Sequence, residues 1–124
     1  MPGRKSPVSD RAVEFILTRK LPQLGQLTEV SLADALGVSL PYLLRKFKKA
    51  QKIDLKEFIT REKVHTAMFL LEQHHDISIE EVAEKLGFSR INQFIDAFKN
   101  YIAADPVTYH SLKSNSSPVF TARN

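Results

Sequence analysis

The sequence predicts an all-α fold in which two helix-turn-helix units are joined by a long connecting helix. Apolar residues recur at helical spacing through most of the chain, and no segment alternates with the period of two that a strand requires. Capping signals and glycines divide this pattern into seven expected helices. The segment 32–39 also recurs at 82–89, which indicates two copies of one unit.

The first unit is expected to cover residues 9–53, after a disordered tail at residues 1–8. Ser9 or Asp10 can cap its first helix, because both side chains accept hydrogen bonds from free backbone N–H groups. Apolar residues then recur every three to four positions until Pro22 breaks the helix.

The turn of the first unit has signals at both of its helices. Ser31 is expected to begin the second helix, with Asp34 at the acidic position of a capping box. Gly37 ends this helix, because glycine adopts the left-handed conformation at the lowest cost. Ser39 caps the third helix, and Pro41 lies in its first turn, where a missing N–H does no harm.

The connecting helix is expected over residues 54–73, beginning with the capping box Asp54-x-x-Glu57. Twenty residues give a rod of about 30 Å, close to the distance of about 34 Å between major grooves on one side of DNA. We therefore expect one chain to place two recognition helices in adjacent major grooves. Its buried stripe and flank are expected to comprise Phe58, Ile59, Lys63, Val64, Ala67, Leu70 and Leu71.

The second unit is expected over residues 74–113, followed by a disordered tail at residues 114–124. Its signals follow the order of the first unit: a capping box, a terminating glycine, a serine cap and a last short helix. These signals are Ser78-x-x-Glu81, Gly87, Ser89 and Asp105-Pro106.

The internal repeat is the strongest evidence for this organisation. Both copies have an alanine four residues before the glycine, so two helices can approach closely, and a serine follows the glycine. This geometry presents the third helix outwards, as entry into a major groove requires. A helical hairpin repeated for packing alone is the less favoured interpretation. After one inserted residue, Leu43, Phe47, Lys48, Asp54, Leu55 and Phe58 match Phe94, Phe98, Lys99, Asp105, Pro106 and Tyr109.

Positive charge is concentrated in the middle of the chain. The net charge is +4, yet residues 41–63 alone hold eight cationic and three acidic side chains, whereas residues 74–100 hold three and five. A basic segment favours an anionic partner such as DNA, although a solvated helix face has the same composition. We therefore expect the first unit to supply most of the affinity for DNA.

Other function classes find little support. The chain has no cysteine and no apolar run of 18 residues, so we expect a cytoplasmic protein that does not enter a membrane. No phosphate loop, nucleophile motif or carboxylate pair is present, so we expect neither an enzyme nor a cofactor. The candidate metal or acid–base groups are His65, His74, His75 and His110, and the adjacent pair does not share a helical face.

The candidate DNA-binding residues lie on the third helix of each unit. Arg45 can pair with guanine O6 and N7, although a phosphate contact or a free surface charge is an equal alternative. Asp96 holds the matching position and is expected to be repelled by phosphates, unless it accepts from cytosine. Leu43, Phe47 and Ala50 are expected in the core. The first set of candidates is Ser39, Leu40, Pro41, Leu44, Arg45, Lys48 and Lys49, and the second is Ser89, Arg90, Asn92, Gln93, Asp96 and Lys99.

From about Ala12 to Leu112 the chain resembles the DNA-binding domain of the AraC/XylS family of bacterial transcription regulators. The resemblance implies seven helices, two helix-turn-helix units and no enzymatic activity. It departs where the family usually has arginine, at Lys63, Asp96 and His110, and where it usually has glycine, at Ala103. The most specific residues are Ser78-Ile79, Val82-Ala83, Leu86-Gly87-Phe88, Phe94, Phe98-Lys99, Pro106 and Tyr109.

We therefore expect a sequence-specific, double-stranded DNA-binding regulator of transcription. The alternative is a helical protein–protein adaptor that kept the fold and lost DNA binding, which the acidic second unit favours. We expect the chain to bind DNA as a monomer, and RNA polymerase is a further candidate partner. Either the chain is a free-standing regulator or it is a piece of a larger protein.

Overall fold

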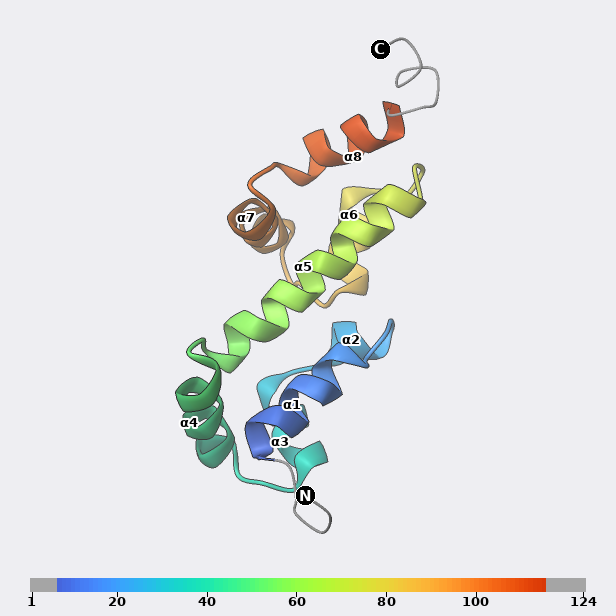
Figure 1. The fold of residues 1–124 in the computed structure, drawn as a ribbon. Coiled ribbons are helices and arrows are strands. Elements are labelled where there is room, and N and C mark those ends of the chain that lie inside the picture. The colour runs from blue at the N-terminus through green and yellow to red at the C-terminus, as the bar shows by residue number, and fades with distance from the viewer. Residues whose placement is uncertain (1–6, 116–124) are drawn as a thin grey trace. The chain divides into compact units, whose positions relative to one another are not determined.

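The computed structural model describes residues 7–115, with side chains through residue 112, and shows no strand among them (Figure 1). This confirms the all-α fold. The expected tails lie mostly outside the described residues, but the first helix already includes Val8 and the last extends to Asn115. The helices are α1 (Val8–Leu17), α2 (Gln23–Gln26), α3 (Glu29–Leu36), α4 (Leu40–Gln51), α5 (Leu55–Gln73), α6 (Ile79–Lys85), α7 (Ile91–Ile102) and α8 (Pro106–Asn115).

The chain forms two compact units that divide between residues 62 and 63, within α5. The seven expected helices are present in the described residues, and the short α2 is an addition. It lies where Pro22 was expected only to break the chain. Leu24 of α2 and Leu27 just after it are buried, so the segment is held by the core despite its length.

Two of the expected helix starts in the first unit are wrong. Helix α1 begins at Val8, directly after Pro7, so Ser9 lies inside the helix, where it is buried and does not act as the cap. Helix α3 begins at Glu29 because the Thr28 hydroxyl accepts from the Ser31 N–H at 3.0 Å. The Ser31 hydroxyl accepts from the Thr28 N–H at 2.9 Å, so serine fills the role usually held by glutamate.

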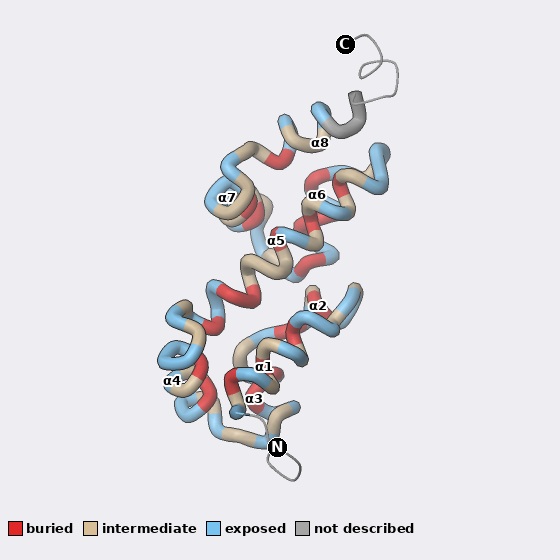
Figure 2. The backbone as a smooth tube through the Cα atoms, viewed as in Figure 1, coloured by how far each residue is buried: buried red, intermediate tan, exposed pale blue. Residues whose placement is uncertain are grey.

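The core of the first unit lies between α1, α3 and α4. Ala12, Ile16, Leu32, Leu43 and Phe47 are at most 1% exposed, and buried segments occur on all three helices (Figure 2). Removing this much apolar surface from water is the main stabilising contribution to the unit.

Polar contacts join α8 to the end of α5 and to the residue that follows it. The Tyr109 hydroxyl donates to the Glu72 carboxylate, and His110 Nε2 lies 3.2 Å from the His74 carbonyl oxygen. Burial and the negative charge of Glu72 raise the pKa of Tyr109. The bond therefore stabilises the unit at neutral pH, and its contribution is lost as pH rises beyond the usual tyrosine pKa of about 10.

The structure confirms the internal repeat through matching backbone bonds. Gly37 and Gly87 have φ values of +72° and +80°. The N–H of the residue after each glycine donates to the alanine carbonyl five residues earlier, at 3.1 Å in the first unit and 3.0 Å in the second. These are the bonds of a Schellman turn, so both copies end their first helix in the same way.

The aromatic packing repeats as well. Phe47 and Phe58 meet edge to face with ring centroids 5.5 Å apart. Their counterparts Phe98 and Tyr109 also meet at 5.5 Å, with interplanar angles of 64° in the first pair and 62° in the second. The sequence match therefore corresponds to one packing arrangement used twice.

Helices α4 and α7 both end in a residue with a left-handed backbone that is not glycine. Lys52 has φ +64° and Ala103 has φ +61°. We expect Ala103→Gly to stabilise the second unit by about 0.5–1 kcal/mol, because glycine relieves the left-handed strain but makes the unfolded chain more flexible. Urea denaturation measures this change.

The matched control for that variant is Ala97→Gly in the middle of α7. Glycine there gains nothing from a left-handed backbone, and we expect a loss of about 1 kcal/mol. A loss of stability in Ala103→Gly as large as in Ala97→Gly would contradict the strain at residue 103.

Candidate nucleic-acid interface

Helix α4 is held by its N-cap and by two buried anchor side chains, one aliphatic and one aromatic. The Ser39 hydroxyl accepts from the Tyr42 N–H at 3.3 Å, which confirms the expected N-cap, and Pro41 lies in the first turn. Leu43 and Phe47 are fully buried. Because these two side chains fix one face of α4 in the core, its opposite face is directed to solvent.

The structure places the first-unit candidates in two groups. Ser39, Pro41, Arg45, Lys48 and Lys49 are exposed, as binding to DNA requires. Leu40 and Leu44 are only half-buried and border the core, so less of their surface is available than expected. The expectation that Ala50 belongs to the core is wrong: it is exposed near the end of α4.

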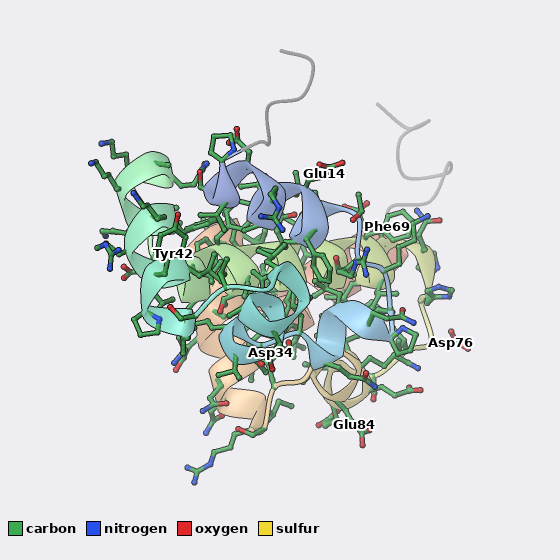
Figure 3. The ribbon with its side chains drawn as sticks, turned by 90° about the horizontal axis from the view of Figure 1, so that it is seen from below. Glu14, Asp34, Tyr42, Phe69, Asp76 and Glu84 are labelled. Atoms are coloured by element: carbon green, nitrogen blue, oxygen red, sulfur yellow. The ribbon has the colours of Figure 1, made fainter. Side chains whose placement is uncertain are left out.

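Two of the exposed cations of α4 contact other side chains of the first unit. The Arg45 guanidinium carbon lies 5.7 Å from the centre of the Tyr42 ring. Lys48 Nζ lies 3.4 Å from Asp54 Oδ1, but both side chains are more than half exposed, so this ion pair is weak and can be exchanged for a phosphate. Figure 3 shows nitrogen-tipped side chains along the outer side of α4, with Tyr42 among them.

Tyr42 is a candidate that the sequence analysis missed. The signal was present, because an exposed tyrosine three residues before Arg45 lies on the same side of a helix. Tyr42 carries no charge, and residue 93, its counterpart in the repeat, is a glutamine, so neither charge nor the repeat points to this position.

The start of α7 differs from the start of α4. The cap position is held by Arg90, which makes no side-chain cap bond, so the expected Ser89 cap is wrong. The single inserted residue moves Ser89 one position away from the helix end. The Ser89 hydroxyl instead lies 2.9 Å from Gln93 Oε1 and donates to it.

The exposed face of α7 is less basic than that of α4. Phe94 and Phe98 are fully buried and fix the opposite face. Asp96 is exposed at the position that Arg45 holds in the first unit, so a negative charge replaces a positive one at the centre of the face. The second-unit candidates that are exposed are Ser89, Arg90, Asn92, Gln93, Asp96 and Lys99.

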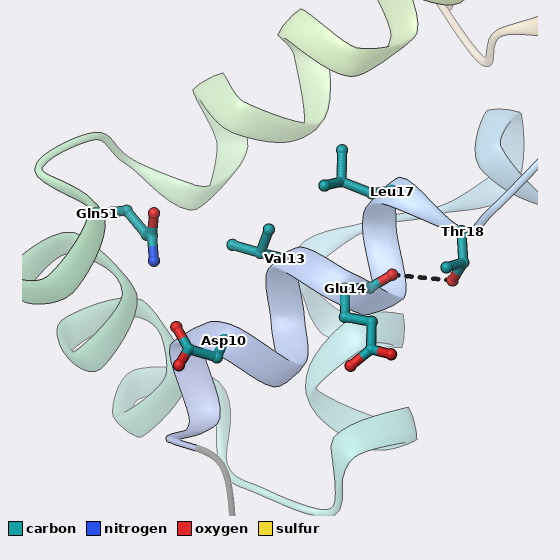
Figure 4. A pocket seen from close by; sticks show the side chains of 6 residues that line it. All are labelled: Asp10, Val13, Glu14, Leu17, Thr18 and Gln51. Carbon is teal, nitrogen blue, oxygen red and sulfur yellow. Dashed lines mark hydrogen bonds between the residues drawn. The ribbon is translucent and has the colours of Figure 1, made fainter.

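A hollow of about 600 Å³ between α1 and Gln51, the last residue of α4, has the wrong charge for DNA (Figure 4). It is lined by Asp10 and Glu14, together with apolar Val13 and Leu17, and no cation borders it. Thr18 closes one end, where its hydroxyl donates to the Glu14 carbonyl at 2.9 Å. Carboxylates repel phosphates, so this hollow lies outside the candidate interface.

The described residues contain neither a metal-ligand cluster nor a membrane-spanning helix. Within this part of the chain, no three histidine or acidic side chains come together as metal ligands would. None of the helices between residues 7 and 115 is long and apolar enough to cross a membrane.

Comparison with known proteins identifies the family. A family model described as a helix-turn-helix domain matches residues 32–111, more than half of the chain. An uncharacterized response regulatory protein of Staphylococcus epidermidis is 32% identical over 104 residues, which are 80% of this chain and 41% of that protein. The chain therefore spans about two fifths of the length of this relative.

Two solved structures have the same fold. The C-terminal domain of AraT, a response regulator from Geobacillus stearothermophilus, has a TM-score of 0.72 and 31% identity, covering 89% of this chain and 88% of that one. The DNA-binding domain of AdpA, in complex with a target DNA, has a TM-score of 0.74 and 23% identity, covering 92% and 98%. The chain belongs to the AraC/XylS family of helix-turn-helix transcription regulators.

Proposed function

We propose that the chain binds double-stranded DNA in a sequence-specific way and regulates transcription. The observation that carries this proposal is the exposed cationic face of α4, which lies opposite the buried anchors Leu43 and Phe47. A recognition helix needs this division, because one face must pack on its own unit while the other enters a groove of about 12 Å. The structure of the AdpA domain with its target DNA supports the same use of the fold.

The roles proposed for the exposed residues follow from their chemistry. Arg45 is the base-reading residue, because its fork of donors matches guanine O6 and N7. Lys48 and Lys49 bind phosphates, and Pro41 contacts a thymine methyl group. Arg90, Asn92, Gln93 and Lys99 are the corresponding donors of α7. The chain needs no cofactor and carries out no catalysis in this role.

On DNA, we propose that one chain occupies an asymmetric site in two adjacent major grooves. Arg45 and Asp96 differ in charge at matching positions, so the two half-sites must differ in sequence. The first unit supplies most of the affinity. RNA polymerase is a proposed partner of the bound complex, in the cytoplasm.

Binding to random duplex at several salt concentrations tests DNA binding against the adaptor alternative. We expect weak binding at low salt that falls steeply as salt rises, because each bound phosphate releases a counterion. The double variant Lys48→Ala with Lys49→Ala removes both proposed phosphate contacts of α4 and should lower the salt dependence. No binding of the native chain at low salt would favour the adaptor.

Lys48→Ala is expected to weaken binding to all duplexes alike, because a phosphate contact carries no base information. The slope of log affinity against log salt should become flatter by about one unit. Fluorescence anisotropy over a salt series measures the slope. A loss confined to one base pair would contradict this assignment.

Asp96→Arg is expected to strengthen binding to nonspecific duplex at low salt. The variant removes a charge that phosphates repel and adds one that they attract. The same exchange at Glu84, an exposed residue on the helix before α7, is the control for net charge alone. An equal gain in both variants would show that Asp96 does not approach the DNA.

A further inference from the structure

Tyr42 lies on the surface of α4 close to two cations. Its side chain is 39% exposed, and its backbone N–H is held by the Ser39 cap. The Arg45 guanidinium carbon and Lys46 Nζ each lie 5.7 Å from the centre of its ring. Both distances are within the range of about 6 Å over which the negative face of an aromatic ring attracts a cation.

The ring also borders the space between α4 and the start of α1. Tyr42 borders a cleft of about 450 Å³ together with Pro7, Val8 and Ser9 at the start of α1. The ring therefore lies at the edge between α1 and the recognition helix, and it has only two torsions with which to leave this place. Arg45, in contrast, has a long flexible side chain that loses much conformational freedom when it contacts a base.

The ring lies on the N-terminal side of Arg45 along α4. Helical side chains lean toward the N-terminus of their helix, so Arg45 at three residues after Tyr42 is directed back along α4 to the ring. The N-terminal part of a recognition helix is the part that contacts base edges. A guanidinium held against Tyr42 is therefore kept near that end before DNA arrives.

We propose that Tyr42 is a positioning residue that sets base specificity by holding the Arg45 guanidinium at the N-terminal end of α4. This inference rests on the proposed role of Arg45 in reading a base. The interaction uses the face of the ring and does not need the hydroxyl group. The second unit has Gln93 and Asp96 at the matching positions, so this device belongs to the first unit alone.

The test compares Tyr42→Phe, which keeps the ring, with Tyr42→Leu, which keeps an apolar side chain but removes the ring. The DNA is a duplex selected by the native chain from a random pool, and the base pair read by Arg45 is the one whose preference Arg45→Ala abolishes. We expect Tyr42→Leu to lower the preference at that base pair by about two- to fivefold. Its affinity for random duplex should stay unchanged, and Tyr42→Phe should behave like the native chain.

A second measurement reports on the contact without DNA. The ring current of Tyr42 should shift the NMR signals of the Arg45 side chain, and the shift should persist in Tyr42→Phe and disappear in Tyr42→Leu. Circular dichroism of both variants checks that α4 is folded. Because this readout needs no DNA, it separates the contact from the function proposed for it.

The outcomes distinguish the two proposals. If Arg45→Ala changes no base preference, the role of Arg45 fails, and with it the specificity role of Tyr42. If Arg45→Ala abolishes a preference but Tyr42→Leu retains it in full, the positioning role of Tyr42 is overturned alone. Tighter specific binding by Tyr42→Leu would also overturn it, because the ring would then be withholding Arg45 from the DNA.

Discussion

Phe98→Ala is expected to destabilise the second unit by about 3–5 kcal/mol, the cost of truncating a fully buried phenylalanine. Phe98 has no exposed surface, and its ring lies 5.8 Å from Phe94 and 5.5 Å from Tyr109. The variant leaves a cavity and removes both edge-to-face contacts at once. Urea denaturation, with hydrogen exchange to locate the effect between residues 63 and 112, measures the loss.

Phe47→Ala is the matched variant, because Phe47 is fully buried at the same position of the repeat and contacts Phe58 in the same way. We expect a loss of similar size that hydrogen exchange places in the first unit. Exchange that increases equally in both units for either variant would contradict their description as two compact units.

Arg45→Ala is expected to cost about 1–3 kcal/mol of specific binding and to relax the preference at one base pair. A bidentate contact carries both affinity and base information, whereas a phosphate contact carries affinity alone. Equilibrium binding to a selected duplex and to its single-base variants measures both quantities.

Arg45→Lys separates charge from geometry in that experiment. Lysine keeps the positive charge but cannot reproduce the planar fork, so much of the base preference should still be lost. A specific affinity unchanged within about twofold in Arg45→Ala would overturn the assignment, since a good bidentate pair contributes more than that.

Much of the fold follows from short-range chemistry that is visible in the sequence. Gly37 and Gly87 mark turns that few other residues tolerate, and both have the left-handed backbone expected of them. Ser39 and Ser78 were identified as caps, and both accept the expected bonds. Asp105 does so as well, accepting from the N–H groups of two residues in α8.

The remaining features depend on competition between signals. Thr28 caps α3 because serine closes its capping box, a role for which the sequence pattern expects glutamate. Ser89 appeared equivalent to Ser39, but one inserted residue moves it away from the end of α7. Periodicity does not resolve such shifts of one residue, which the packing of the anchors Phe94 and Phe98 decides.

Two features of the candidate site could not be predicted from the sequence for a similar reason. Ala50 fits the apolar stripe of α4 by spacing, yet it is exposed because the helix reaches its end there. Tyr42 fits an apolar pattern by composition, yet it contacts two cations at the surface. To predict either exposure, one must know how the helix is oriented relative to its own core, and a single sequence does not supply this orientation.

Selection of bound duplexes from a random pool, followed by sedimentation of the complex on the selected site, tests the central claim most directly. We expect an asymmetric site with two unlike half-sites about 10 base pairs apart, the stronger preference in the half-site read by Arg45, and one chain per duplex. A palindromic site bound by two chains, or no enrichment of any sequence, would contradict the claim.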